Sequence, residues 1–167
     1  MESKELADFM DACRRGDDAG VEQLCARFPE LVNSRDAKGF TPLILAVYTN
    51  QPSVVAFLIL KGAAVDAQDT AGNTALMGAC FKGHEALAHS LIEAGADVNR
   101  RNSQGTPSLT FAAMFGQLGI AALLLKYGAA TNLPDARGKT SIDHALMQKD
   151  EQMISLIQRE GGPPPGS

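Results

Sequence analysis

The feature that most constrains this chain is a layout that recurs every 33 residues. Units of this layout start at Asp36, Asp69, Asn102 and Asp135, and the last unit is shorter than the others. Four columns stay in step across the units: Gly39, Gly72, Gly105 and Gly138; Leu43, Leu76, Leu109 and Ile142; Ala46, Ala79, Ala112 and Ala145; Gly62, Gly95, Gly128 and Gly161. A fixed period of this length predicts a solenoid in which each unit packs only on its neighbours.

The columns also predict the local structure of each unit. The Asp-x-x-Gly opening predicts a tight turn, and the threonines at positions 41, 74 and 140 predict the N-cap of a first helix. A second apolar helix follows, and we expect the second glycine to end it in the left-handed conformation. In the unit that starts at Asn102 the order is GTPSL, so Thr106 is predicted to cap the helix in place of Pro107 and to start it one residue early.

These units resemble ankyrin repeats, whose pattern is D-x-x-G-x-T-P-L-H-x-A-x-x-G-H followed by V-x-x-L-L-x-x-G-A-x-x-N. The resemblance covers residues 36–161 in register and reaches back more loosely to about Lys4. The family's His after Thr-Pro-Leu is absent, and Ile44, Met77, Thr110 and Asp143 stand in its place. The resemblance implies an all-α solenoid of stacked helix-turn-helix units with β-turn tips. It implies a capping repeat at 1–35, repeats at 36–68, 69–101 and 102–134, a capping repeat at 135–161 and a disordered tail at 162–167.

Composition sets limits on compartment and partners. The net charge of −4 gives no overall basic field of the kind that draws proteins to nucleic acid. The opening residues do not form a signal peptide, and no stretch approaches the ~20 apolar residues of a membrane span. The three cysteines, Cys13, Cys25 and Cys80, cannot all pair within the chain. Free thiols are typical of a reducing compartment, so we expect a cytoplasmic protein that contacts no membrane.

The segment GACFKGHEALAH, residues 78–89, has the residue types of a metal site but not the spacing. A zinc-protease helix needs His-Glu-x-x-His, with the two ligands on one face. His84 and His89 are five apart, which turns them ~140° from each other around a helix. The cysteines align with helix-packing positions and are expected to behave as small buried hydrophobic residues. With no glycine-rich nucleotide loop present, the sequence predicts neither an enzyme nor a bound cofactor.

A stripe of apolar residues runs across the predicted first helices. A stacked array has a concave side made of turns and first helices, and the two residues after each alanine pair are not needed by its core. Those positions hold Tyr48-Thr49, Phe81-Lys82, Met114-Phe115 and Met147-Gln148, with Arg14-Arg15 continuing the row and Phe40 near the turn. An exposed stripe of this kind usually marks a contact site. The alternative is that the rings fold back onto neighbouring helices as partial core.

The turns add basic residues, which favour an acidic partner through association rate and orientation, although such residues are also common on solvated faces. We therefore predict a non-catalytic protein–protein interaction module, acting as adaptor, scaffold or inhibitor, that binds a partner protein on its concave face. The predicted partner-binding residues are Arg14, Arg15, Lys38, Phe40, Tyr48, Thr49, Phe81, Lys82, Arg101, Met114, Phe115, Arg137, Lys139 and Met147.

Three other functions are compatible with the chain. The main alternative is an accessory protein that binds or delivers haem or a metal through His84, His89, Met114 or Cys80. An enzyme would need a deep pocket that the pattern does not predict. Nucleic-acid binding is permitted by the arginines at the turns but is not favoured by the overall charge.

Overall fold

The computed structural model describes residues 3–161, and the predicted tail at 162–167 lies outside them. The described part is all-α, with no strand. Its helices are α1 (Lys4–Arg15), α2 (Asp18–Arg27), a short 3-10 helix η1 (Pro29–Asn33), α3 (Pro42–Tyr48), α4 (Pro52–Leu60), α5 (Ala75–Lys82), α6 (Glu85–Glu93), α7 (Ser108–Met114), α8 (Leu118–Lys126), α9 (Ser141–Gln148) and α10 (Glu151–Glu160). The predicted all-α stack of helix-turn-helix units is confirmed.

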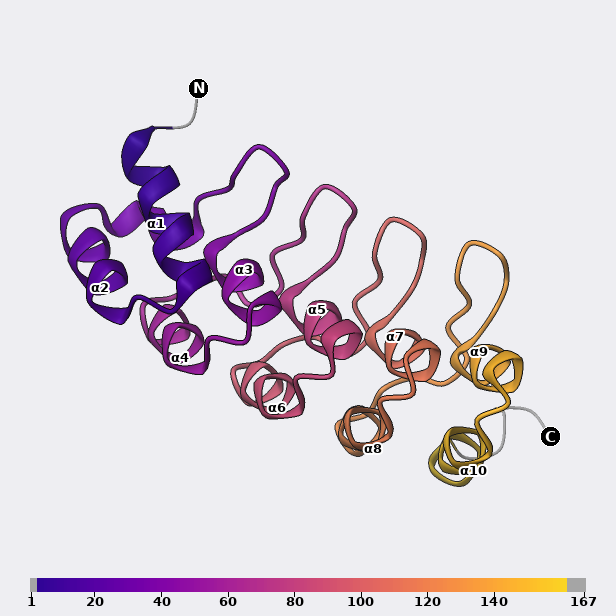
Figure 1. Cartoon of the computed structure of the whole chain (residues 1–167). Helices are drawn as coiled ribbons and strands as arrows, with labels where there is room; N and C mark the ends of the chain where they lie inside the picture. The colour runs from indigo at the N-terminus through magenta and orange to yellow at the C-terminus, as the bar shows by residue number, and fades with distance from the viewer. Residues whose placement is uncertain (1–2, 162–167) are drawn as a thin grey trace.

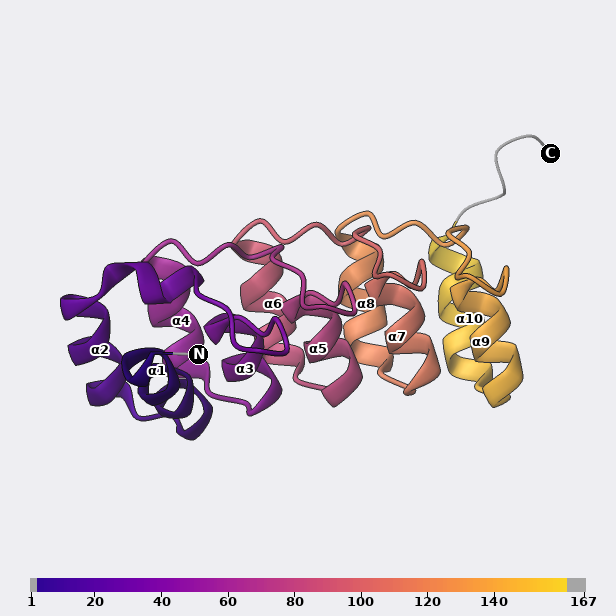
Figure 2. The ribbon, with the colours of Figure 1, turned by 90° about the horizontal axis from the view of Figure 1, so that it is seen from above.

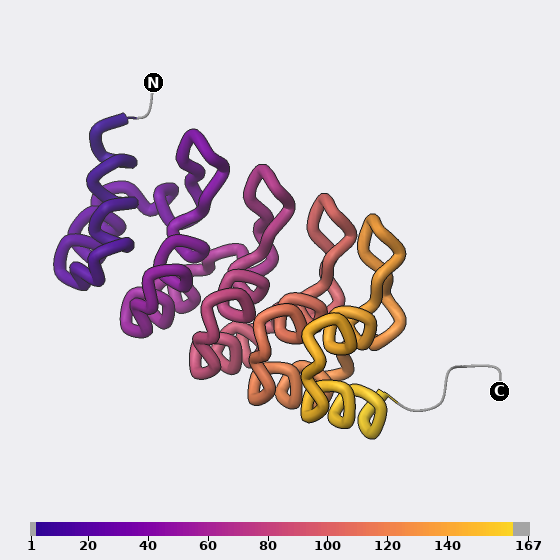
Figure 3. The backbone as a smooth tube through the Cα atoms, turned by 45° about the vertical axis from the view of Figure 1, so that its right-hand side comes forward, coloured from indigo at the N-terminus to yellow at the C-terminus, as the bar shows by residue number. Residues whose placement is uncertain are grey.

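The helices form two layers, with pairs standing side by side along one row (Figures 1 and 2). One layer holds α3, α5, α7 and α9, and the turn that precedes each of these helices projects as a loop on the same side of the molecule (Figure 3). The other layer holds α4, α6, α8 and α10. We call the surface made of the turns and the first helices the tip face, and the second layer the outer layer.

Each turn is built around the first side chain of its unit. The Oδ1 atom of Asp36 accepts hydrogen bonds from the backbone amides of Lys38 and Phe40, both at 2.9 Å. Asp69, Asn102 and Asp135 make the same pair of bonds in their own units. The glycine three residues on has φ between 70° and 78° in all four turns, a region that side chains disfavour. The Asp-x-x-Gly column therefore acts as predicted.

The first helices start in register, including the one for which the sequence indicated a shift. Thr41 and Thr74 accept from the amides three residues on, at 3.2 and 3.3 Å. Thr106 does not start its helix early: Pro107 is the N-cap, without a side-chain bond, and α7 begins at Ser108. The prediction was wrong because the turn sets the backbone path. The amide of Thr106 is held in the turn by Asn102 Oδ1 at 2.9 Å, which leaves the next residue, Pro107, as the N-cap.

The core runs as one cluster along the whole stack. The alanine column is fully buried, which lets each first helix approach the next unit closely, and the leucines Leu58, Leu91 and Leu124 are buried at the same place in each second helix. Three of the second-column glycines end these helices with φ between 85° and 95°, as predicted. Gly161 does not, since it keeps right-handed angles with φ at −74°. Its amide continues the helical pattern and donates to the carbonyl of Ile157 at 2.8 Å.

Candidate functional site

Four aromatic rings follow one another across the tip face. The ring centroids of Phe40 and Tyr48 lie 6.3 Å apart, those of Tyr48 and Phe81 6.1 Å apart, and those of Phe81 and Phe115 4.7 Å apart. The last pair meets edge to face, at 82° between the ring planes, which is a favoured geometry for aromatic pairs. These rings come from the turn before α3, from α3, from α5 and from the end of α7. We call this set the aromatic row.

The row is half packed and half open. Phe81 and Phe115 are 39% and 43% exposed, whereas Phe40 and Tyr48 are half-buried and pack on the core. Tyr48 lies over Gly78 of α5, where an added Cβ would come within 2.8 Å of the ring. Burial, together with the nearby charge of Asp69, raises the pKa of the Tyr48 phenol. The partial-core alternative therefore holds for Phe40 and Tyr48, whereas Phe81 and Phe115 stay predicted contact residues.

The methionines of the predicted stripe do not join the row. Met114 is half-buried and lines a cavity with residues of the next turn and with His144 of α9. Met147 is 65% exposed at the end of the stack, beside Leu146, which is 54% exposed. Thr49 is half-buried and its hydroxyl donates to the carbonyl of Leu45 at 2.8 Å, so its hydroxyl is used within its own helix end. The predicted stripe is therefore not one uniform surface.

The predicted basic residues fall into two groups. Arg14 and Arg15 pair with Asp11 at 3.6 and 2.8 Å, and Arg101 is bound to backbone carbonyls. The others are exposed and form no ion pair within residues 3–161: Lys38, Lys82, Arg137 and Lys139. Only this second group has positive charges that are not already paired with a carboxylate or bonded to backbone carbonyls of this chain.

Arg101 belongs to a ladder of side chains that join successive turns. Arg35, Gln68 and Arg101 occupy the same place in their units, directly before the turn residue. Each donates to the carbonyl of its own turn glycine and to a carbonyl of the next unit, at Gln68, Arg101 and Pro134 respectively. These bonds fix the distance between neighbouring turns. Arg101 is therefore a structural residue, although its side chain is exposed.

A buried acid–base pair at the last turn is missing from the sequence-based set. His144 Nε2 lies 2.8 Å from Asp135 Oδ2, and both side chains are nearly buried. Burial raises the pKa of Asp135, but the bond with His144 and the amides of Lys139 and Arg137 outweigh it and hold the pKa below its ordinary value of 3.8. In the other units the place of His144 is taken by Leu45, Gly78 and Phe111. That change of residue type in an apolar column is the signal that sequence reasoning could have used.

The last unit should lose stability in acid. The amide of Thr140, and then its hydroxyl, hold the pKa of Asp143 below 3.8, in the same direction as Asp135. A carboxyl whose folded pKa is depressed stabilises the fold above its ordinary pKa, and this contribution is lost as the pH falls through the lowered value. We expect the parent to lose more stability than Asp135→Asn between pH 6 and pH values below about 3.8, measured by urea unfolding.

Asp135→Asn is a matched variant because Asn102 already forms the same turn in its own unit. The variant removes the carboxylate that faces His144 and leaves the two turn bonds possible. Equal acid loss in parent and variant would contradict a stabilising role for the Asp135 charge.

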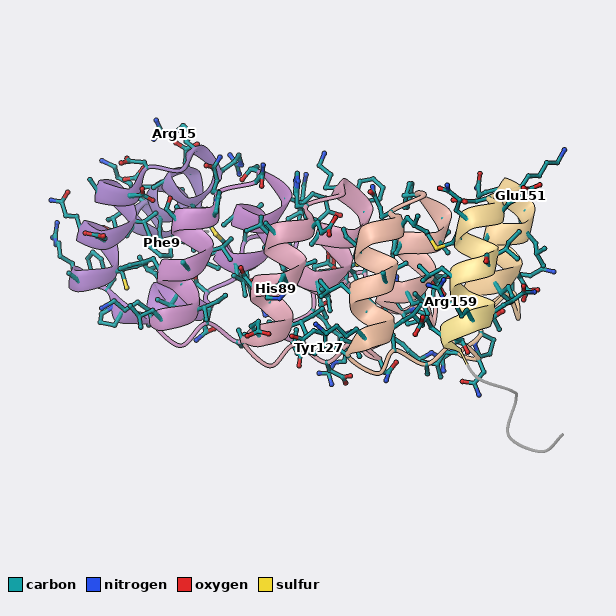
Figure 4. The ribbon with its side chains drawn as sticks, turned by 90° about the horizontal axis from the view of Figure 1, so that it is seen from below. Phe9, Arg15, His89, Tyr127, Glu151 and Arg159 are labelled. Carbon is teal, nitrogen blue, oxygen red and sulfur yellow. The ribbon has the colours of Figure 1, made fainter. Side chains whose placement is uncertain are left out.

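The histidines and cysteines form no metal-binding group. Within residues 3–161, no three His, Cys, Asp or Glu side chains gather closely enough to hold a metal ion. His89 lies on α6 in the outer layer (Figure 4), exposed, with Nε2 4.0 Å from Glu93. Burial raises the pKa of the Cys13 and Cys80 thiols to about 12, and Cys25 adds to the effect at Cys13. These thiols are therefore held in the protonated form, which is a poor nucleophile and a poor metal ligand.

Comparison with known families agrees with this architecture. A family model for ankyrin repeats in three copies matches residues 9–102, and one for ankyrin repeats in many copies matches residues 91–145. The chain belongs to the ankyrin repeat family. Proteins of this family are generally protein–protein interaction modules and are typically non-catalytic. A search of curated proteins finds no match to the chain, and within residues 3–161 no helix has the length and apolar character to cross a membrane.

Proposed function

We propose that this protein binds a partner protein on its tip face, the surface predicted from the sequence as concave, and acts there as an adaptor, scaffold or inhibitor without catalysis. The observation that carries the proposal is the exposed half of the aromatic row. Phe81 and Phe115 hold each other edge to face at 4.7 Å and remain about two-fifths exposed. Rings fixed in this way lose little freedom on binding and supply large apolar contact area.

The charges around the row support a partner with acidic groups. Lys38, Lys82 and Arg137 are exposed on or beside the tip face and have no ion-pair partner in the described part of the chain. Such cations speed and orient the approach of an acidic surface, and their effect weakens as salt rises. The proposal places the apolar contact at the centre and the charged contacts around it, as in most interfaces.

The test compares two variants in affinity capture from the source cell. Phe81→Ala combined with Phe115→Ala should lower the recovery of the specific partner at least about fivefold, which corresponds to a loss of ~1 kcal/mol or more. Leu60→Ala is the matched control, because Leu60 is an apolar side chain 81% exposed at the end of α4 in the outer layer. The control should capture the partner as the parent does.

Unfolding must be measured beside capture. Because both rings are partly exposed, we expect the double variant to stay folded and to melt close to the parent. If the specific partner is recovered equally with the parent, the double variant and the Leu60 variant, the aromatic row is not the binding site.

One further part of the proposal rests on the thiols of the chain. All three cysteines are buried and free, which suits a reducing compartment and leads us to seek the partner in the cytoplasm. We do not propose the alternative of a carrier for haem or a metal, because no observation on residues 3–161 favours it. An absorbance spectrum and a metal analysis of the purified protein would test it directly.

A further inference from the structure

Two cavities lie at opposite ends of the aromatic row. One, of about 520 Å³, is lined by Met10, Phe40, Leu45 and the turn residues 36–38. The other, of about 250 Å³, is lined by Met114, His144 and the turn residues 135–137. The two turns occupy the same place in units three repeats apart and read Asp-Ala-Lys and Asp-Ala-Arg. The row thus runs between two cavities that are lined by equivalent turns.

A cation stands at the third position of these two turns and is absent from the inner ones. Lys38 and Arg137 hold this position at the ends, whereas Ala71 and Gln104 hold it in the units between them. Both cations are exposed and form no ion pair within the described residues. Arg35 and Arg101, which directly precede a turn residue, are not comparable because both are tied to carbonyls. The tip face therefore has an aromatic centre, with Lys82 beside Phe81, and a free positive charge at the third turn position at each end.

We infer that the partner presents a linear segment with apolar side chains in its middle and an acidic side chain at each end. The apolar residues lie on the aromatic row, and the acidic residues reach Lys38 and Arg137. An extended chain advances ~3.3 Å per residue, so about five residues cover the ring-to-ring steps, and further residues on each side extend toward the two cavities. This inference rests on the proposed function, because it identifies the kind of partner for the same surface.

The first experiment selects peptides without reference to a cellular partner. A displayed library of random peptides of about twelve residues, more than twice the length that covers the aromatic row in extended form, is selected on the purified protein. We expect the selected sequences to carry Asp or Glu near both ends and aromatic or aliphatic residues between them. Selected peptides are then synthesised with a fluorophore, and their affinities are measured by anisotropy.

Charge reversal then tests each end separately. Lys38→Glu and Arg137→Glu should each weaken the peptide at least about fivefold, and a peptide with Lys in place of the facing acid should recover most of that loss. Lys126→Glu is the matched control, since Lys126 is an exposed lysine at the end of α8 in the outer layer. It should leave the affinity of the peptide unchanged.

The outcomes separate this inference from the proposed function. Selected peptides that bind Lys38→Glu and Arg137→Glu as tightly as the parent would overturn the inference. It is also overturned if no linear peptide is selected while the Phe81/Phe115 double variant still loses its cellular partner, because the partner then presents a folded surface. In that case the proposed function stands. Peptides that bind the double variant as tightly as the parent would contradict both.

Discussion

Thr110→Val is expected to raise the free energy of unfolding by about 1–3 kcal/mol, which is the usual cost of a buried polar group without a hydrogen bond. Thr110 is fully buried in α7, and its hydroxyl has no hydrogen-bond partner among residues 3–161. Valine has nearly the same shape and replaces the hydroxyl with a methyl group. The measurement is equilibrium urea unfolding followed by helical circular dichroism.

The chain provides a matched control of opposite sign. Thr74 is as well buried as Thr110, but its hydroxyl accepts a hydrogen bond from the backbone amide of Met77 at 3.3 Å and caps α5. Thr74→Val makes the same chemical change and should cost about 1 kcal/mol, because a helix amide loses its partner. If both variants shift the free energy of unfolding in the same direction, the two hydroxyls do not differ in hydrogen bonding as described.

The fold was predictable because the repeat places the same residue types at the same positions in four units. The Asp-x-x-Gly column fixes each turn through side-chain bonds within that turn, and the same pattern recurs in four units, so it can be identified without coordinates. Pro107 shows where this reasoning failed. We read the shifted GTPSL order locally, but the bond from Asn102 to the Thr106 amide keeps the start of the helix in register. Contacts fixed earlier in the unit outweighed the local order.

The candidate site was less predictable, since the repeat says which positions the core does not need but not where a long side chain goes. Tyr48 turns onto α5 because Gly78 leaves space there, and that space exists only once the two helices are stacked. Arg101 looked like a binding residue, yet it reaches two carbonyls that only the folded turns bring within range. Leu146 was missed because its equivalents, Val47, Cys80 and Ala113, are all buried by a following helix.

Arg101→Ala is expected to lower the stability of the last unit by about 2 kcal/mol, a value that allows for the solvent exposure of its two charged hydrogen bonds. The guanidinium joins the carbonyl of Gly105, at 2.8 Å from Nε, to that of Pro134 in the next unit. Stability in a solenoid depends on nearest-neighbour contacts, so the loss should be largest beyond this ladder step. Hydrogen exchange should show faster opening of α9 and α10 than in the parent, with α3 to α6 little changed.

Arg101→Gln separates the two-point bond from the charge. Gln68 occupies the same place one unit earlier and donates to the carbonyls of Gly72 and Arg101 at 2.6 and 3.0 Å. A glutamine at 101 can form the equivalent bonds to Gly105 and Pro134, so this variant should keep most of the exchange protection of α9 and α10. If it opens as readily as Arg101→Ala, the contribution comes from the charge or the aliphatic stem of Arg101. In that case, side-chain hydrogen bonds of the kind that Gln68 makes would not be what couples the last two turns.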